Sequence, residues 1–104
     1  MIKTTHFSTL GLLALTLPLT GCSDVNDYKP DAGLDAKTLF SQACADCHGD
    51  SGAGKFGFLL KIAGTDESME EVVEKINKGG FIMPSFPNIS PEEAQSIALY
   101  LKGE

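Results

Sequence analysis

Two cysteines and a histidine lie close together in the stretch CADCHGDSG, residues 44–52. Cys44, Cys47 and His48 have the spacing C-x-x-C-H, which is the pattern of covalent haem attachment. The same residue types also serve as zinc ligands or as a dithiol redox pair. The nine residues permit all three chemistries, so the rest of the chain has to decide between them.

An export signal is predicted at the N-terminus. Lys3 gives a weakly basic start and the apolar run 7–19 follows it, which is the order of a secretory signal peptide. As a helix this run would be about 20 Å long, too short for the roughly 30 Å of hydrocarbon in a bilayer. A signal peptide is therefore favoured over a membrane-spanning anchor helix.

The four residues LTGC at positions 19–22 resemble the bacterial lipobox, in which the cysteine is lipidated and becomes the new N-terminus. We therefore expect residues 1–21 to be a lipoprotein signal peptide and Cys22 to carry a lipid anchor. The alternatives are ordinary signal cleavage nearby or a free Cys22 thiol. Residues 22–34 are predicted to form the lipidated N-terminus and a flexible, polar tether, followed by one domain over 35–104.

The cysteine and histidine counts argue against zinc. The whole chain has three cysteines and two histidines, and a structural zinc ion takes four such ligands. Lipidation would use Cys22, and His6 would be removed with the signal peptide. His48 also follows Cys47 directly and would have difficulty turning onto the same ion.

A helix is predicted immediately before Cys44. Asp35 is a good N-cap, and apolar residues recur at helical spacing over 36–43. These residues are Ala36, Leu39, Phe40 and Ala43. Cys44 would thus end a helix, whereas a thioredoxin-type dithiol begins a helix that follows a strand. Nothing strand-like precedes Cys44, so haem attachment is the favoured chemistry.

Two further helices are predicted, each beginning with a serine that has a glutamate three residues later, the signature of a capping box. One begins at Ser68 and stops at Gly79, and the other runs from Ser90 to Lys102. The predicted fold class is therefore all-α. Three main helices would carry loops wrapped around one covalently bound haem.

The loops between these helices are unusually apolar. Residues 58–63 and 81–89 carry large side chains without a regular period, and a chain this short offers them no evident partner. Their large residues are Phe58, Leu59, Leu60, Phe81, Ile82, Met83, Phe86 and Ile89. A large, flat, apolar cofactor between the two loops would give these side chains a partner.

His48 and Met83 are the expected axial ligands of the haem iron, because iron can be held by His on one side and Met on the other. Met83 lies in an apolar loop just before Pro84, which fixes the local backbone. The alternative role of Met83 is to fill a gap in the core. Met69 has helix-spaced apolar neighbours and is expected to pack in the core. No second histidine remains after signal cleavage, which excludes bis-histidine ligation.

Residues 35–102 resemble a small bacterial class I, monohaem cytochrome c in its lipoprotein form. The motifs are CADCHG at 44–49, Met83-Pro84 and IALYLK at 97–102, in that order. The resemblance implies one haem c attached through the two cysteines of the first motif.

The same resemblance implies that the first and last helices cross. Phe40 would pack there against Ile97 and Tyr100, and Ala36 would allow the close approach.

The chain departs from the family in one respect. Family members usually carry a proline after the C-x-x-C-H glycine, and its carbonyl holds the ring N–H of the histidine. No proline occurs between Gly49 and Gly64. A carbonyl within 56–62 is expected to take this role, since a ligating histidine normally donates its other ring N–H. The candidate donors to the haem propionates are Lys55, Lys61, Tyr100, Ser85 and Asn88.

The expected function is transfer of single electrons between respiratory or other redox proteins, at a membrane, on the periplasmic side or on the outer surface of a Gram-positive cell. No enzymatic activity and no small-molecule substrate at the iron are expected, because both axial positions are filled. The net charge of −6 argues against nucleic acid binding and favours a redox partner with a basic docking surface.

Two other functions are alternatives to the mobile electron carrier. The first is a fixed haem subunit of a larger oxidase or reductase complex. The second is a peroxidase-like or gas-binding protein in which Met83 detaches from the iron. The sequence offers no distal histidine or arginine for the second.

Overall fold

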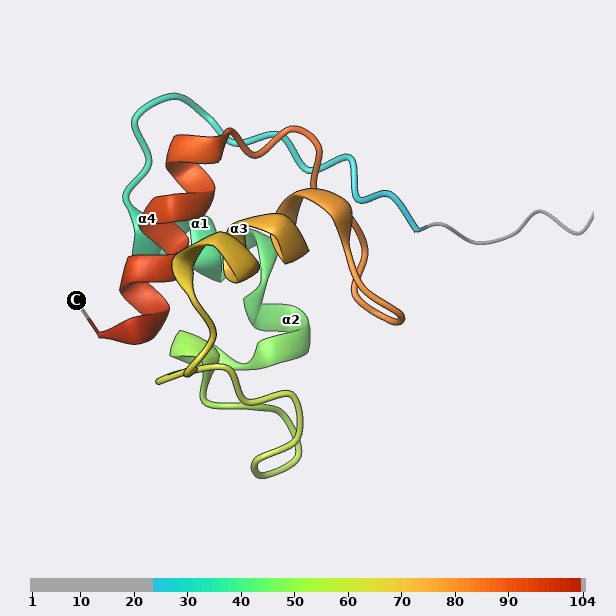
Figure 1. Ribbon diagram of the computed structural model, residues 1–104, viewed down its shortest axis with the longest axis vertical. Helices are drawn as coiled ribbons and strands as arrows, with labels where there is room; N and C mark the ends of the chain where they lie inside the picture. The colour runs from blue at the N-terminus through green and yellow to red at the C-terminus, as the bar shows by residue number, and fades with distance from the viewer. Residues whose placement is uncertain (1–23, 104) are drawn as a thin grey trace, which may run out of the picture.

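The computed structural model describes residues 24–103, so the predicted signal peptide and Cys22 lie outside the described residues. In chain order the elements are α1 (Ala36–Ala43), the single turn α2 (Ala45–His48), the 3-10 turn η1 (Asp50–Gly52), α3 (Met69–Lys78) and α4 (Pro91–Lys102) (Figure 1). Within this range, β pairing is limited to two isolated bridges. The predicted all-α class and the three main helices are confirmed. None of the described helices is long and apolar enough to span a membrane.

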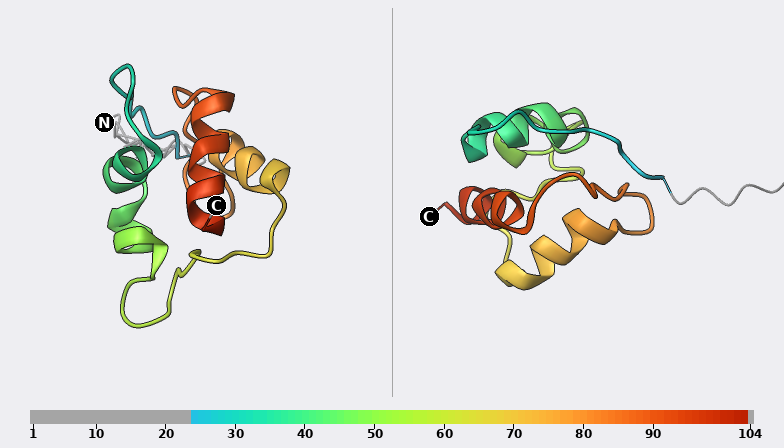
Figure 2. Two further views of the ribbon diagram at one scale, coloured as in Figure 1. Left: turned by 90° about the vertical axis from the view of Figure 1, so that its left-hand side faces the viewer. Right: turned by 90° about the horizontal axis from the view of Figure 1, so that it is seen from above.

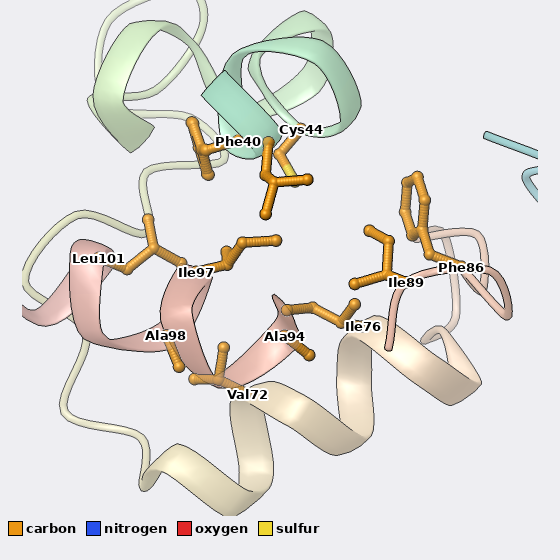
Figure 3. Close-up of a cluster of buried hydrophobic side chains, with 11 residues drawn as sticks. Phe40, Cys44, Val72, Ile76, Phe86, Ile89, Ala94, Ile97, Ala98 and Leu101 are labelled. Carbon is orange, nitrogen blue, oxygen red and sulfur yellow. The ribbon is translucent and has the colours of Figure 1, made fainter. Parts of the chain in front are cut away.

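Helix α4 is the element against which the other helices pack. Both α1 and α3 contact α4, and Figure 2 shows α4 lying between the α1–α2 segment and α3. Ala94 and Ala98 of α4 are completely buried, and their small side chains allow a neighbouring helix to come close. Figure 3 shows Val72 and Ile76 of α3 lying close to this alanine face of α4. The core is thus centred on α4.

Helix α1 contacts α4 through an aromatic pair. Phe40 is 1 % exposed, and its ring centroid lies 5.7 Å from that of Tyr100, with the two planes tilted by 51°. Tilted aromatic pairs at this spacing are favourable beyond the area that they bury. Ile97 belongs to the same buried cluster (Figure 3). The predicted packing of Phe40 against the last helix is therefore confirmed.

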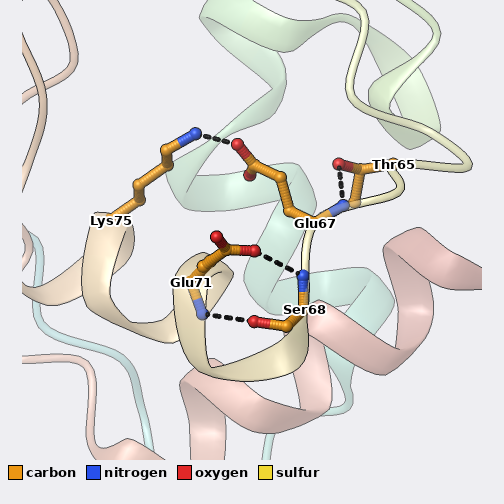
Figure 4. Close-up of polar contacts among 5 residues, drawn as sticks. All are labelled: Thr65, Glu67, Ser68, Glu71 and Lys75. Carbon is orange, nitrogen blue, oxygen red and sulfur yellow. Dashed lines mark hydrogen bonds and ion pairs between the residues drawn. The ribbon is translucent and has the colours of Figure 1, made fainter.

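Side-chain caps define where the main helices begin. The Asp35 carboxylate accepts from the Thr38 N–H at 2.7 Å. At α3, Ser68 accepts from the Glu71 N–H at 3.2 Å, and the Glu71 carboxylate accepts from the Ser68 N–H at 2.8 Å (Figure 4). The same reciprocal capping box opens α4. These bonds satisfy backbone donors that have no partner inside the helix.

The segment predicted as a flexible tether is not free along its whole length. Residues 24–28 lie against the domain, and Val25 forms a parallel bridge with Ser85. Tyr28 is half-buried and packs against the core. The polar composition of the segment predicted a tether because it shows no apolar periodicity. Its two bonds to Ser85 join backbone groups, which do not require such a pattern.

Phe40→Ala is expected to lower the free energy of unfolding by about 3–5 kcal/mol, because it leaves a cavity between α1 and α4. Phe56→Ala is the matched control, since Phe56 is 92 % exposed, and it should change stability by less than about 0.5 kcal/mol. Chemical denaturation of both purified variants measures the difference. Equal losses would show that the α1–α4 contact does not hold the core.

Candidate haem-binding site

The single turn α2 places the three residues of the C-x-x-C-H motif on one side of the chain. Cys44 ends α1 by donating its N–H to the Phe40 carbonyl, and it also begins α2. Its own carbonyl accepts from the N–H of Cys47 at 3.2 Å and from that of His48 at 2.9 Å. Residues three and four apart on a helical turn share a face. The two thiols and the imidazole can therefore address one ligand.

The two thiols differ in their surroundings. Cys44 is buried and Cys47 is exposed. Burial, together with the neighbouring Cys47, raises the pKa of the Cys44 thiol to about 11. Dithiol oxidoreductases depend instead on a cysteine whose pKa is lowered, because the thiolate is the nucleophile. The environment of Cys44 suits a cysteine that ends in a thioether better than one that cycles between thiol and disulfide.

The ring of His48 is held by a backbone carbonyl. Its Nδ1 lies 2.7 Å from the carbonyl oxygen of Leu60. When Nδ1 donates to this carbonyl it carries the ring hydrogen, which leaves Nε2 free to bind a metal, and this is the usual arrangement of a ligating histidine. Leu60 lies within residues 56–62, where the sequence predicted a substitute for the missing proline. That prediction is confirmed, although the sequence did not single out the residue.

The loop that presents the Leu60 carbonyl has an unusual backbone. Leu60 has φ +60° and Phe56 has φ +50°, and a non-glycine residue in this left-handed region costs about 1–2 kcal/mol. Gly49 must be glycine, because a Cβ there would lie 2.1 Å from the Gly54 carbonyl oxygen. Such strain persists where surrounding contacts over-determine it, often at functional sites. Here it turns a carbonyl toward His48.

A cavity of about 480 Å³ opens beside this loop, which is within the size range of cofactor pockets. His48 and Met83 both line it, although they lie 35 residues apart in the sequence. Its other linings include Phe40, Cys44, Leu60, Ile76 and Ile97. Met69 does not line this cavity and packs against the core instead, as predicted. The structure therefore brings the predicted attachment and ligand residues Cys44, His48 and Met83 to one cavity.

The apolar loops divide into buried and exposed parts. Phe86 and Ile89 are buried in the core, so the expectation that they need a cofactor as partner was wrong. The Phe86 N–H bonds the Ile76 carbonyl at 2.8 Å, which turns this residue toward α3. Phe81 and Ile82 line the cavity and are 105 % and 81 % exposed. A large apolar group in the cavity would cover part of this surface, which is favourable. The cavity therefore fits a haem.

Charged side chains border the cavity on one side. Lys75 and Glu67 form an ion pair (Figure 4), and both residues line the cavity. Of the predicted propionate donors, Lys61 lines it as well. The Tyr100 hydroxyl lies 3.0 Å from Ser51 and is not among the lining groups. The sequence did not identify Lys75 as a residue that lines the cavity, because a lysine in the last turn of a helix is already explained by its interaction with the helix dipole.

Comparison with known proteins supports these features. The model of the family described as cytochrome C oxidase, cbb3-type, subunit III matches residues 31–101. Cytochrome c-550 of Bacillus subtilis (strain 168) is 37 % identical over 57 residues. That alignment covers 55 % of this chain and 48 % of the relative, so the chain spans about half the length of the curated relative that it matches.

Solved structures of similar fold include one that is described as a c-type cytochrome. The KustC0563 c-type cytochrome matches with a TM-score of 0.56 and 26 % identity, covering 67 % of this chain and 96 % of that one. A mutant of OmcF matches with a TM-score of 0.57 and 26 % identity, covering 69 % and 96 %.

The match over residues 31–101 covers the C-x-x-C-H turn, the Met83 loop, α1, α3 and all of α4 except its last residue. The fold, the cavity and the comparisons therefore agree on a c-type cytochrome. The chain belongs to the family described as cytochrome C oxidase, cbb3-type, subunit III, and it is a small, all-α monohaem cytochrome c with covalently bound haem c.

Proposed function

We propose that this protein is a membrane-anchored carrier of single electrons whose haem iron is held by His48 and Met83. Electron transfer is the general role of the c-type cytochromes to which it belongs. The observation that carries the finer proposal is the cavity lined by Cys44, His48 and Met83 together. Cys44 and Cys47 would form the two thioether bonds.

The chain's own residues control what the haem can do. A bound haem supplies an iron that gains and loses one electron. The Leu60 carbonyl lies at Nδ1 of His48 and leaves Nε2 free to bind the iron, and Met83 would offer its thioether sulfur from the second loop. If His48 and Met83 both bound the iron, no position would remain there for a small-molecule substrate. A thioether ligand also raises the reduction potential relative to a second histidine.

Surface charge supports a basic redox partner. The chain has net charge −6, which would attract a basic docking surface at long range and make the association rate fall as salt rises. Not all acids are available for docking, because Glu67 and Glu74 pair with Lys75 and Lys78.

A fixed haem subunit of a larger complex is the second candidate function. The specific observation that favours it is the description of the matching family as a subunit of a cbb3-type oxidase. Detergent extraction of native membranes distinguishes the two functions. Stable co-purification with other redox subunits supports the fixed subunit, whereas isolation as a single chain that is rapidly oxidised by a soluble partner supports the carrier.

Met83→Ala is expected to open one axial position of the iron, because alanine has no sulfur to bind it. The reduced variant should then bind carbon monoxide, and the sulfur-to-iron absorption of the oxidised protein should be lost. Met69→Ala is the matched control and should keep the parent spectrum, since Met69 packs outside the cavity. A Met83→Ala variant with an unchanged low-spin spectrum would assign the ligand to another residue.

Leu60→Pro is expected to raise the reduction potential by on the order of tens of millivolts. Proline holds φ near −65°, whereas Leu60 has φ +60°, so the carbonyl would turn away from His48. The histidine would then be a weaker donor to the oxidised iron. Leu60→Gly also removes this side chain, which lines the cavity, but glycine adopts positive φ readily, so the carbonyl should stay at His48 and this variant measures the effect of the side chain alone. Voltammetry of the pair measures the effect, and equal shifts in both variants would refute a role for the carbonyl.

Cys22→Ser is expected to release the exported protein from the membrane fraction, because serine offers no thiol for the lipid. Acyl chains contribute about 0.8 kcal/mol of membrane binding for each buried CH₂, so the shift should be nearly complete. Cell fractionation and the mass of the mature N-terminus check it. A variant that stays membrane-bound with its haem intact would mean that the protein is retained by another route.

A further inference from the structure

The first described residues lie against the loop that carries Met83. We call residues 24–28 the N-terminal strap. The Ser85 N–H donates to the Asp24 carbonyl at 3.0 Å, and the Asn26 N–H donates to the Ser85 carbonyl at 2.8 Å. These two bonds form the parallel bridge between Val25 and Ser85. In Figure 1 the strap runs beside the segment that leads into α4.

The strap is itself fixed to the domain at its far end. The Tyr28 hydroxyl donates to the Gln42 side chain of α1 at 2.6 Å. The Asn88 side-chain amide donates to the Asp27 carbonyl at 3.3 Å. Tyr28 also packs against the buried core. The strap therefore joins α1 to the Met83 loop.

The other side of the loop is held by the end of α3. The Gly80 N–H donates to the Met83 carbonyl at 2.9 Å, and the Phe86 N–H donates to the Ile76 carbonyl at 2.8 Å. Gly79 has φ +74°, and a Cβ there would lie 2.7 Å from the Met83 carbonyl oxygen. Helix α3 and the Gly80 amide just beyond its end thus hold the residues on both sides of Ser85.

Ser85 itself depends on the strap. Its N–H and its carbonyl both bond to strap residues, and the preceding Pro84 has no N–H to contribute. Without the strap, both backbone groups of Ser85 would turn to water. The segment from Met83 to Phe86 would then be held by α3 alone.

We propose that the N-terminal strap positions Met83 by holding its loop closed over the cavity. The inference rests on the proposed ligation of iron by Met83. A thioether is readily displaced by a stronger ligand, so the fraction of molecules with Met83 off the iron depends on how firmly the loop is held. Loss of both strap bonds to Ser85 should raise this fraction about thirtyfold, given the usual net contribution of two hydrogen bonds.

Asn26→Pro tests the proposal in the full-length holoprotein. Proline removes the N–H that donates to the Ser85 carbonyl. Val25→Pro is the matched control, because the Val25 N–H donates to no backbone acceptor among residues 24–103. Asn26→Ala is a second control, since it keeps the N–H and, like Asn26→Pro, removes the side-chain oxygen that accepts from the Tyr28 N–H at 2.9 Å. None of these residues lines the cavity.

The readout is the apparent affinity of the oxidised protein for imidazole, which can take the iron position only when Met83 is off. Apparent affinity scales with the fraction of competent molecules. Asn26→Pro, which loses one of the two bonds, should bind imidazole about fivefold more tightly than the parent, whereas Val25→Pro and Asn26→Ala should stay within about twofold. An unchanged affinity in Asn26→Pro overturns the proposal.

A second measurement needs no substitution. Because coupling between sites is reciprocal, displacement of Met83 by imidazole in the parent protein should loosen the strap. Hydrogen exchange at the Asn26 and Ser85 amides should become faster, while that at Ala98 in α4 stays the same. Unchanged exchange at the strap overturns the proposal even where Asn26→Pro fails to fold.

The parent spectrum separates this inference from the function on which it rests. If the parent protein lacks the sulfur-to-iron absorption, Met83 is not the ligand and the proposed ligation fails. If the absorption is present and both strap tests are negative, only the role of the strap is refuted.

Discussion

The packing of α1 and α3 against α4 is the constraint on which the haem site depends. The buried Ala94 and Ala98 let neighbouring side chains come close to α4. The end of α1 leads directly into Cys44 and the turn that carries His48, and the end of α3 leads into the loop that carries Met83. One central helix therefore brings two segments that are distant in sequence to the same cavity.

Backbone hydrogen bonds hold the loops of the site. On one loop, the Leu60 carbonyl orients the His48 ring. On the other loop, the peptide groups of Ser85 bond to the N-terminal segment. Both loops expose apolar side chains in this structure, as at Phe81 and Ile82, so side-chain packing alone does not account for their shape. Fixed loops also suit electron transfer, because a ligand set that does not move keeps reorganisation small.

The surroundings of Cys44 and of His48 both favour haem binding, through burial of the thiol and through a hydrogen bond to the imidazole. Burial keeps the Cys44 thiol protonated, with a pKa raised to about 11, so it is not a ready thiolate. The hydrogen bond at Nδ1 of His48 leaves Nε2 available. This single turn would allow Cys44 to form a stable thioether and His48 to bind the metal. The arrangement favours permanent cofactor binding over thiol exchange.

The main helices and the motif residues were predictable from the sequence, because caps such as Ser68 with Glu71 and apolar periodicity act over a few residues. The spacing of Cys44, Cys47 and His48 likewise indicated haem attachment. The tertiary structure alone decided that Leu60 supplies the carbonyl for His48 and that the polar N-terminal segment packs at Ser85. Every residue except proline carries the same backbone N–H and C=O. Hydrogen bonds that these groups form between distant parts of the chain therefore cannot be predicted from the residue types.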